Sequence, residues 1–359
     1  MQRGVDVSII VPCYNTERFL GQALASAQQN SRANVEILVL NDGSTDGSPS
    51  IMRAFEQRDQ RIRVIDKPNQ GYGATVNRGI DEARGTYVAI LEPDDWVLPG
   101  MYDDLFGLAR ATAWPDVVKS SYWRILCHDG CDAQKAHGYL YGRIKNTHVP
   151  ITLADEPQLI QYHPSVWSAL YRRSYLNDQG IRMREVPGAG WVDNPFCVHT
   201  MAAARSIVYT NEPYYCYRED LASASSAHTD AQIMIDRWNE RQDVLDQLAI
   251  CDAGILKANY VVGLRFMAQI LRGELDHKTH DALVGMARRM DQDIVRTIDC
   301  IPTHVVARCM EFAGSNERPP SALAYKAHLA REASWALRSN GPKFLFHNLK
   351  LALSKGAHA

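Results

Sequence analysis

The chain has 359 residues, and its 39 lysine and arginine residues against 41 aspartate and glutamate residues give a formal net charge of −2 at pH 7. So balanced a charge excludes a broad cationic surface, and we expect no nucleic-acid partner. With 46% hydrophobic and 22% charged residues, the composition is that of a folded globular protein and excludes disorder as the main state.

The N-terminal half alternates short apolar runs with helical patterns. Two runs rich in β-branched residues, 7–12 and 35–40, predict buried parallel strands. Residues 16–29 carry apolar side chains at helical spacing, which supplies the crossover that parallel strands require. The pattern continues with expected helices at 49–57 and 74–83 and expected strands at 61–66 and 86–91. An α/β fold with a mostly parallel sheet follows.

The middle of the chain is less regular. We expect a loop excursion from about residue 127 to residue 164, because this stretch has little periodicity. The other expected elements are helices at 101–111, 166–176 and 194–204, a strand at 116–125, and extended chain at 206–217 that is broken at Pro213.

From residue 229 the pattern becomes helical. Residues 229–232 have the spacing of a capping box, and a stripe of apolar residues follows. Further helices are expected at 260–271, 280–290 and 293–312, then a pause at 314–320 and a helix to the end. We therefore predict two domains, residues 1–225 and a helical C-terminal region of residues 226–359.

Polar residues follow the predicted strands at 12–15, 41–48 and 92–96. In open α/β sheets, ligands bind beyond the carboxyl ends of the strands, so we expect these loops to converge on one site. The first loop lacks the G-x-G-x-x-G motif of dinucleotide-binding folds. Asp94 and Asp95 instead supply hard oxygen ligands suited to Mg²⁺ or Mn²⁺, which would neutralise a leaving diphosphate.

Four segments together resemble the family 2 glycosyltransferases, which have the GT-A nucleotide-sugar fold. They are VSIIVPCYN at 7–15, NDGSTDGS at 41–48, NQG through NRG at 69–79, and GTY through PDD at 85–95. The resemblance covers about residues 5–220 and implies a GT-A-type, Rossmann-like sheet flanked by helices. It also implies a nucleotide-sugar donor, UDP-linked in this family.

The resemblance assigns roles to individual residues. The nucleotide-binding residues would be Pro12, Tyr14, Asp42, Asn77 and Asp94, with the Asp42 carboxylate accepting a hydrogen bond from the base.

Asp94 and Asp95 fall on the D-x-D element with which the family binds its metal. The family usually has aspartate where this chain has Glu92, and a small residue at the position of Pro93. This departure weakens a sugar or metal role for Glu92 and leaves Asp95 as the preferred direct ligand of the cation.

The family also has an acidic catalytic element, often Glu-Asp, that an aromatic residue follows. Residues 191–196 (WVDNPF) match it with Val192 in the usual place of glutamate, so only Asp193 carries over as the base. A carboxylate beside the acceptor hydroxyl takes its proton while the oxygen attacks and inverts the anomeric carbon. The resemblance also places Arg218 near the diphosphate, next to a mobile loop at 223–227.

We therefore expect an inverting, metal-dependent glycosyltransferase that acts on a glycan or lipid-linked glycan in surface polysaccharide or glycoconjugate biosynthesis. Two alternatives stay open. A nucleotidyl or phosphoryl transferase would need a phosphate-binding Lys/Arg loop, which is not found near residues 12–15. The second alternative is a non-catalytic member of the family that binds a nucleotide or a glycan. Val192 leaves this alternative open because it stands in the usual place of the catalytic glutamate.

Simpler interpretations stand beside these. Residues 41–48 could form only a turn and helix cap, Asp94 and Asp95 a solvated helix start, and Asp193 a helix N-cap.

Residues 127–137 contain two cysteines and two histidines, but no second close pair of ligands, so we favour a reduced loop without zinc. With no C-x-x-C pair among the eight cysteines, we expect thiols rather than a disulfide framework.

Two interpretations of the C-terminal segment 342–355 stay open. Pro342 suits a helix start, and Lys343, His347, Lys350 and Ser354 would share one face of that helix. The apolar face either packs against other helices or a second subunit, or lies on an anionic membrane. Without a signal-type or membrane-spanning apolar stretch, we expect a cytoplasmic protein, at most peripheral to the inner face of the membrane.

Overall fold

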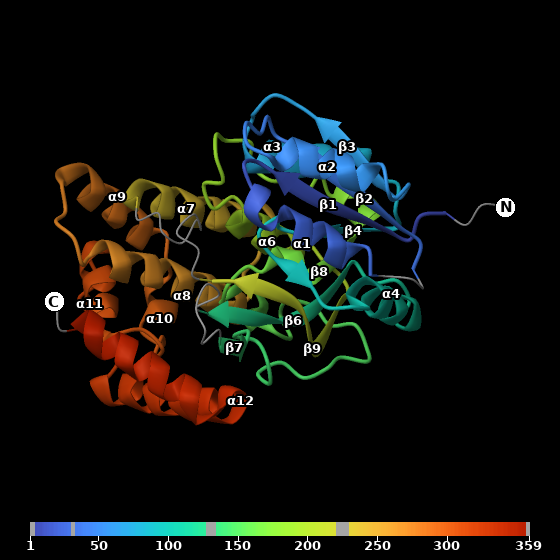
Figure 1. Cartoon of the computed structure of the whole chain (residues 1–359). Coiled ribbons are helices and arrows are strands. Elements are labelled where there is room, and N and C mark those ends of the chain that lie inside the picture. Colours follow the sequence, from blue (N-terminus) through green and yellow to red (C-terminus); the bar gives the residue numbers. More distant parts are fainter. Residues whose placement is uncertain (1–3, 30–32, 127–133, 220–229, 357–359) are drawn as a thin grey trace.

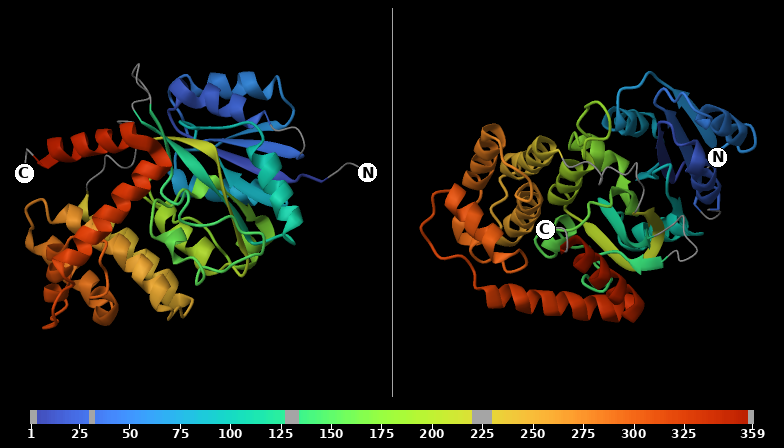
Figure 2. Two further views of the ribbon diagram at one scale, coloured as in Figure 1. Left: turned by 90° about the horizontal axis from the view of Figure 1, so that it is seen from below. Right: turned by 60° about the vertical axis from the view of Figure 1, so that its left-hand side comes forward.

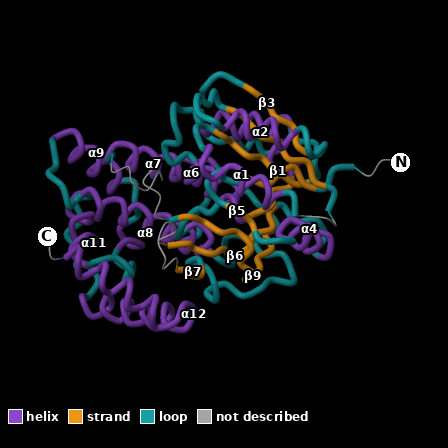
Figure 3. The backbone as a smooth tube through the Cα atoms, in the orientation of Figure 1, coloured by secondary structure: helices purple, strands orange, loops and turns teal. Residues whose placement is uncertain are grey.

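The structure is a computed structural model that describes residues 4–29, 33–126, 134–219 and 230–356 (Figure 1). Strands and helices alternate in the N-terminal part of the chain, and the C-terminal part is helical (Figure 3). The predicted α/β fold with a helical C-terminal extension is therefore confirmed.

A nine-stranded sheet forms the centre of the N-terminal part. Its strands are β1 (Val7–Cys13), β2 (Val35–Asn41), β3 (Ile62–Asp66), β4 (Tyr87–Ile90), β5 (Trp96–Val97), β6 (Val117–Leu126), β7 (Gln134–His137), β8 (Ala169–Arg172) and β9 (Ile207–Arg218). They are ordered β3-β2-β1-β4-β8-β6-β9-β5, with β7 added on β6. Only β5, β7 and β8 run against the others, so the sheet is mostly parallel.

The central strands are buried over their whole length. β1 and β2 pair in parallel from Val7 opposite Val35 to Cys13 opposite Asn41, and all seven residues of each strand are buried. Strands that are covered on both faces need apolar side chains on both, which is why their sequences are continuous apolar runs. The same register brings the polar loops that follow β1 and β2 to one edge of the sheet.

The helices of this part are α1 (Glu17–Ala27), α2 (Ser48–Glu56), α3 (Tyr72–Glu82), α4 (Met101–Ala111), α5 (Arg173–Asp178) and α6 (Asp193–Ala202), with 3-10 turns η1 (Pro157–Ile160) and η2 (Val166–Ser168). The first three are the crossovers that the sequence predicts. α3 lies so close to β1 that a Cβ atom at Gly79 would stand 2.5 Å from the Ile10 side chain. Close packing of this kind fixes where the loop before α3 meets the sheet edge.

The predicted helix over 166–176 is wrong. The structure has η2, then strand β8, then α5 in its place. β8 lies between β4 and β6 and pairs antiparallel with both, and Trp167 and Tyr171 are buried in the core. A short apolar run fits a buried strand and a buried helix equally well, so only the vacant position in the sheet decides between them.

The predicted break at Pro213 is confirmed, because the register of β9 against β6 shifts between Thr210 and Pro213.

The predicted single helix over 293–312 is wrong. It is divided into α10 (Gln292–Val295) and α11 (Thr303–Phe312), with Pro302 directly before α11. Proline has no backbone N–H to donate and suits the start of a helix rather than its interior.

The C-terminal part further contains α7 (Ala231–Gln247), α8 (Ala253–Ile270), α9 (His277–Arg288) and α12 (Ala322–Gly356). α7 to α11 bury a core of their own around Trp238, Met267 and Val306. Asp230 caps α7 by accepting hydrogen bonds from the backbone N–H groups of the first turn. Thr229 of the expected capping box and the predicted domain boundary at 225/226 lie outside the described residues.

α12 returns from the helical region to the edge of the sheet and bends at Gly341 (Figure 2). The Arg143 guanidinium pairs with Glu332 at 2.7 Å, and the Trp335 indole donates a hydrogen bond to the Tyr141 carbonyl at 2.9 Å. The first half of α12 is thereby attached to the excursion between β7 and η1.

The predicted membrane face falls on side chains outside the described part of the structure: Lys343, His347, Lys350 and Ser354. The membrane contact of residues 342–355 therefore stays a prediction. No helix within the described residues is both long and apolar enough to cross a bilayer.

Candidate active site

A cavity of about 460 Å³ opens at the carboxyl edge of β1, β2 and β4. We call it the strand-end cavity. It is lined by Pro12, Cys13, Tyr14, Thr16, Asp42, Asn69, Gly71, Tyr72, Thr75, Glu92, Pro93, Asp94, Gly188 and Ala189. Four of the five residues that the sequence suggests for the nucleotide therefore lie around one cavity: Pro12, Tyr14, Asp42 and Asp94.

Asp42 holds the loop before α3 in place. Its carboxylate accepts hydrogen bonds from the backbone N–H groups of Gln70 (2.9 Å) and Gly71 (3.0 Å) and pairs with the Lys67 ammonium group. Gly71 has a φ of +91°, and a Cβ atom there would lie 2.2 Å from the Val186 carbonyl oxygen. This loop and the segment around residue 186 thus close one wall of the strand-end cavity.

Asn77, the fifth predicted nucleotide-binding residue, does not line the strand-end cavity. Its side-chain amide donates to the Met183 carbonyl (2.8 Å) and to Glu185 (3.0 Å) and accepts from the Met183 N–H (2.8 Å). Asn77 is buried and its hydrogen bonds are used within the protein, so its place in the structure is that of a positioning residue. It fixes the segment that leads into the cavity wall at Gly188 and Ala189.

We expect Asn77→Ala to lower the free energy of unfolding by about 2 kcal/mol, because several buried polar groups lose their partners. The loss should be seen in the nucleotide-free protein by chemical denaturation. Asn316→Ala, at an exposed position of the helical region, is the matched control and should unfold like the wild type. If Asn77→Ala changes nucleotide affinity but not the stability of the free protein, Asn77 binds the ligand directly.

The two adjacent aspartates after β4 have different environments. Asp94 lines the strand-end cavity, whereas Asp95 is 1% exposed and does not. Asp95 Oδ1 accepts the Arg218 backbone N–H at 2.7 Å, and Oδ2 has no hydrogen-bond partner among the described residues. Burial raises the pKa of both carboxyl groups. The sequence prefers Asp95 as the direct metal ligand, but the structure opens Asp94 to the cavity.

Arg218 does not face the strand-end cavity as the resemblance suggests. Its guanidinium group lies between the rings of Phe19 (4.5 Å) and Trp96 (4.4 Å), and it donates to Gln22 Oε1 (2.5 Å) and to the Asp94 carbonyl. Two aromatic faces and two neutral acceptors hold this cation in the interior. Arg218 does not line the strand-end cavity but contacts Asp94, which does, so its role near the diphosphate stays a prediction. The predicted loop at 223–227 lies outside the described residues.

Glu92 has a more prominent place in the candidate site than the sequence predicts. It lines the strand-end cavity and accepts a hydrogen bond of 2.5 Å from the Tyr72 hydroxyl. Burial raises the pKa of Glu92 to about 8, and the charges of Asp94 and Asp193 act in the same direction. The sequence indicates a role for Glu92 because it is a polar residue directly after a buried strand. The family usually has aspartate at this position, which weakens that indication.

A second cavity, of about 710 Å³, lies beside Asp193; we call it the aromatic cavity. Its lining comes from β6, β9, α8, α12 and the segments between them, and comprises Tyr122, Tyr139, Gln161, Tyr162, His163, Pro164, Trp191, Asp193, Asn194, Tyr217, Glu219, Val262, Arg265, Phe266 and Glu332. The segment 188–193 borders both cavities, because Gly188 and Ala189 line the first and Trp191 and Asp193 the second.

Asp193 is the first residue of α6. Val192 stands at the N-cap position, and no side chain caps this helix end, so the N-cap interpretation of Asp193 does not describe its position. Its carboxylate has a weak contact with the Asn194 amide, at 3.4 Å, and among the described residues it forms no ion pair. Burial raises the pKa of Asp193 to about 6. A carboxylate with these properties can take up a proton from a hydroxyl group in the aromatic cavity.

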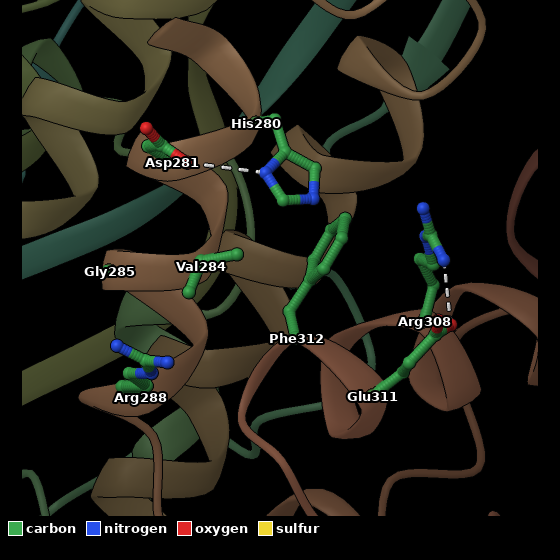
Figure 4. Close-up of a pocket in the computed structure, with 8 residues that line it drawn as sticks. All are labelled: His280, Asp281, Val284, Gly285, Arg288, Arg308, Glu311 and Phe312. Carbon is green, nitrogen blue, oxygen red and sulfur yellow. Dashed lines mark hydrogen bonds and ion pairs between the residues drawn. The ribbon is translucent and has the colours of Figure 1, made fainter. Parts of the chain in front are cut away.

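A third cavity, of about 550 Å³, lies in the helical region between α9 and α11 (Figure 4). Two pairs of its side chains interact along their own helices, His280 with Asp281 and Arg308 with Glu311, and Arg288 also lines it. No residue of the sheet edge lines this cavity, so it is separate from the candidate active site.

The described residues contain no cluster of three or more histidine, cysteine or acidic side chains that could enclose a metal ion by themselves. The cysteines and histidine at 127, 128 and 131 lie outside the described residues. Among the described residues the cysteines are free thiols.

The fold and the strand-end cavity together define an α/β protein with its ligand site at the carboxyl edge of the sheet. Residues 8–178 match the family model "Glycosyl transferase family 2".

Two relatives are consistent with this family match. The chain is 31% identical over 225 residues to the "Uncharacterized glycosyltransferase EpsJ" of Bacillus subtilis, which covers 60% of this chain and 61% of EpsJ. It is 25% identical over 249 residues to the "Succinoglycan biosynthesis protein ExoO" of Rhizobium meliloti, covering 68% and 70% of the two chains. The chain thus spans about three fifths of the length of EpsJ.

The structure is similar to that of residues 1–349 of TarS from S. aureus in complex with UDP-GlcNAc. The TM-score is 0.70 at 17% identity, over 86% of this chain and 89% of that one. At this identity the likeness shows the fold alone, and it extends into the helical C-terminal region.

Proposed function

We propose that the protein is an enzyme that transfers a sugar from a nucleotide sugar, UDP-linked, to a hydroxyl group of a glycan in surface polysaccharide biosynthesis. The observation that carries the proposal is the strand-end cavity, in the part of the chain that matches the family 2 glycosyltransferases, next to a buried aspartate that forms no ion pair among the described residues. The complex of TarS with UDP-GlcNAc supports a UDP-linked donor, and the similarity to the succinoglycan biosynthesis protein ExoO supports a role in polysaccharide biosynthesis.

In the proposed reaction, Asp193 takes the proton of the acceptor hydroxyl as its oxygen attacks the anomeric carbon of the donor. The bond from that carbon to the diphosphate breaks, and the nucleoside diphosphate leaves with the electron pair. Direct displacement inverts the anomeric carbon. The raised pKa of Asp193 suits it to this role, because a carboxylate with a pKa of about 6 is a stronger base than an exposed one and is still deprotonated at pH 7.

The residues present fit a divalent cation. Mg²⁺ and Mn²⁺ commonly use one or two carboxylates together with oxygens of the substrate phosphates, so a complete cage of protein ligands is not required. Asp94 would hold the cation, and the buried Oδ2 of Asp95 is a second candidate because it lacks a hydrogen-bond partner among the described residues. When bound, such a cation neutralises charge on the departing diphosphate.

The test is a thermal-shift series of nucleotide sugars with and without Mn²⁺. We expect a UDP-sugar to raise the melting temperature, because a ligand at 100 times its Kd stabilises the folded state by about 2.7 kcal/mol. Slow release of UDP from the stabilising donor should accompany binding, as water substitutes for the missing acceptor. If no nucleotide sugar stabilises the protein, the proposal is wrong. Stable binding with neither hydrolysis nor transfer would indicate a non-catalytic member instead.

A further inference from the structure

The aromatic cavity has walls suited to a sugar chain. The rings of Tyr139 and Tyr162 stack at a centroid distance of 5.9 Å with 8° between their planes, and Tyr122 and Tyr217 also belong to the lining. An aromatic ring face can pack against the C–H groups of a pyranose, while the phenol hydroxyls offer polar contacts at the rim. The lining is therefore both apolar and hydrogen-bonding, as a carbohydrate surface requires.

Two of the three acidic residues in this cavity are neutralised. Glu219 accepts two hydrogen bonds from Arg124, at 2.5 and 2.7 Å. Glu332, which α12 brings to the cavity, accepts two from Arg143, at 2.9 and 2.7 Å. Both pairs are bidentate, so their charges largely cancel within the wall.

Two arginines, one in the wall of the aromatic cavity and one behind it, have only neutral hydrogen-bond partners among the described residues. Arg265 lines the cavity, and its guanidinium group donates to the Gln161 carbonyl at 2.5 Å and lies 5.3 Å from the centre of the Tyr162 ring. Arg241 is buried behind it and donates to Asn259 Oδ1 (2.9 Å) and the Ile160 carbonyl (2.7 Å). Neither forms an ion pair with a described residue, so at this wall two cations stand against one acid without an ion pair among the described residues, Asp193.

An excess of positive charge in a partly buried wall favours a negatively charged ligand, because the low local dielectric strengthens the attraction. The rest of the molecule has a slightly negative net charge, so this preference is a local property of the aromatic cavity.

We propose that the aromatic cavity binds the acceptor, and that this acceptor is an anionic glycan whose phosphate or carboxylate group lies against Arg265. The aromatic lining packs against a neighbouring sugar ring, and Asp193 faces the hydroxyl that reacts. α12 completes the wall through Glu332, which gives the helical C-terminal region a part in acceptor recognition. The role of Asp193 in this inference rests on the proposed function, whereas the binding of an anionic glycan does not.

The test measures binding of three probes of equal length to the full-length protein by isothermal titration calorimetry: an oligogalacturonate, an oligo(glycerol phosphate) and a neutral maltooligosaccharide. We expect one of the two anionic probes to bind more tightly than the neutral one, and the one that does so distinguishes a carboxylate from a phosphate ligand. Arg265→Gln should weaken binding of that probe by roughly tenfold or more, because it removes a charge-assisted contact.

Two further variants keep the test decisive. Arg265→Lys retains the charge and should lose less affinity than Arg265→Gln, while Arg272→Gln, at an exposed position just beyond α8, should bind like the wild type. UDP-sugar binding, measured separately, should be unchanged in all three variants. The inference is overturned if neither anionic probe binds, if the neutral probe binds as tightly, or if Arg265→Gln keeps the affinity of the wild type. Failure of every UDP-sugar to bind would instead overturn the proposed function.

Discussion

Replacing Asp193 by asparagine is expected to lower kcat for sugar transfer by roughly 10²–10⁴-fold, the usual contribution of a general base. Asparagine has nearly the same shape but cannot accept the proton of the acceptor hydroxyl. The affinity for the nucleotide sugar should stay within about twofold, because Asp193 lies in the aromatic cavity and not in the strand-end cavity. Steady-state kinetics with donor-binding titrations measure both quantities.

The pH dependence gives a second readout for the same residue. Because burial raises the pKa of Asp193 to about 6, the carboxyl group is protonated and inactive below that pH and charged above it. The value of kcat/KM should therefore fall about tenfold per pH unit below pH 6 and level off above pH 7.

Asp281→Asn, on the surface of α9, is the matched control and should leave both the rate and the pH profile unchanged. A pH profile that is flat between about pH 5 and pH 7, or a near-normal rate for Asp193→Asn, would remove Asp193 from the catalytic role.

Removal of divalent cations is expected to have an effect of similar size. The donor diphosphate must enter a cavity that already contains Glu92 and Asp94, with Asp95 buried behind them. Among the described residues the lining contains no lysine or arginine, so without a cation the developing negative charge on the leaving group would have no positive charge beside it. We expect EDTA treatment to lower the transfer rate by roughly 10²-fold or more, and Mn²⁺ or Mg²⁺ to restore it.

The metal content before and after EDTA should be checked by mass spectrometry. Asp94→Asn should raise the Mn²⁺ concentration needed for half-maximal activity, whereas Asp281→Asn should not. A protein freed of metal that turns over at its full rate would contradict the metal proposal and would leave the proposed role of Asp193 in place.

Some of the site depends on contacts between residues far apart in the chain. Arg218 has the charge expected of a diphosphate ligand, yet Phe19 and Trp96 enclose it. Asn77 lies in a segment typical of the family, yet its amide is used to hold Met183. A sequence motif indicates which residues gather in one region, but the direction of each side chain depends on which partners reach it first.

The sequence by itself determined the alternation of strands and helices, the polar loops at the carboxyl ends of the strands, and the position of a lone aspartate at the start of α6. These properties are local, because apolar periodicity and turn residues act over a few positions along the chain. Only the tertiary structure decided that residues 169–172 form a strand, that Asp94 rather than Asp95 faces the cavity, and that Glu332 joins the aromatic cavity. Burial and pairing depend on partners that are between 50 and 189 residues away in these cases, and no local pattern contains that information.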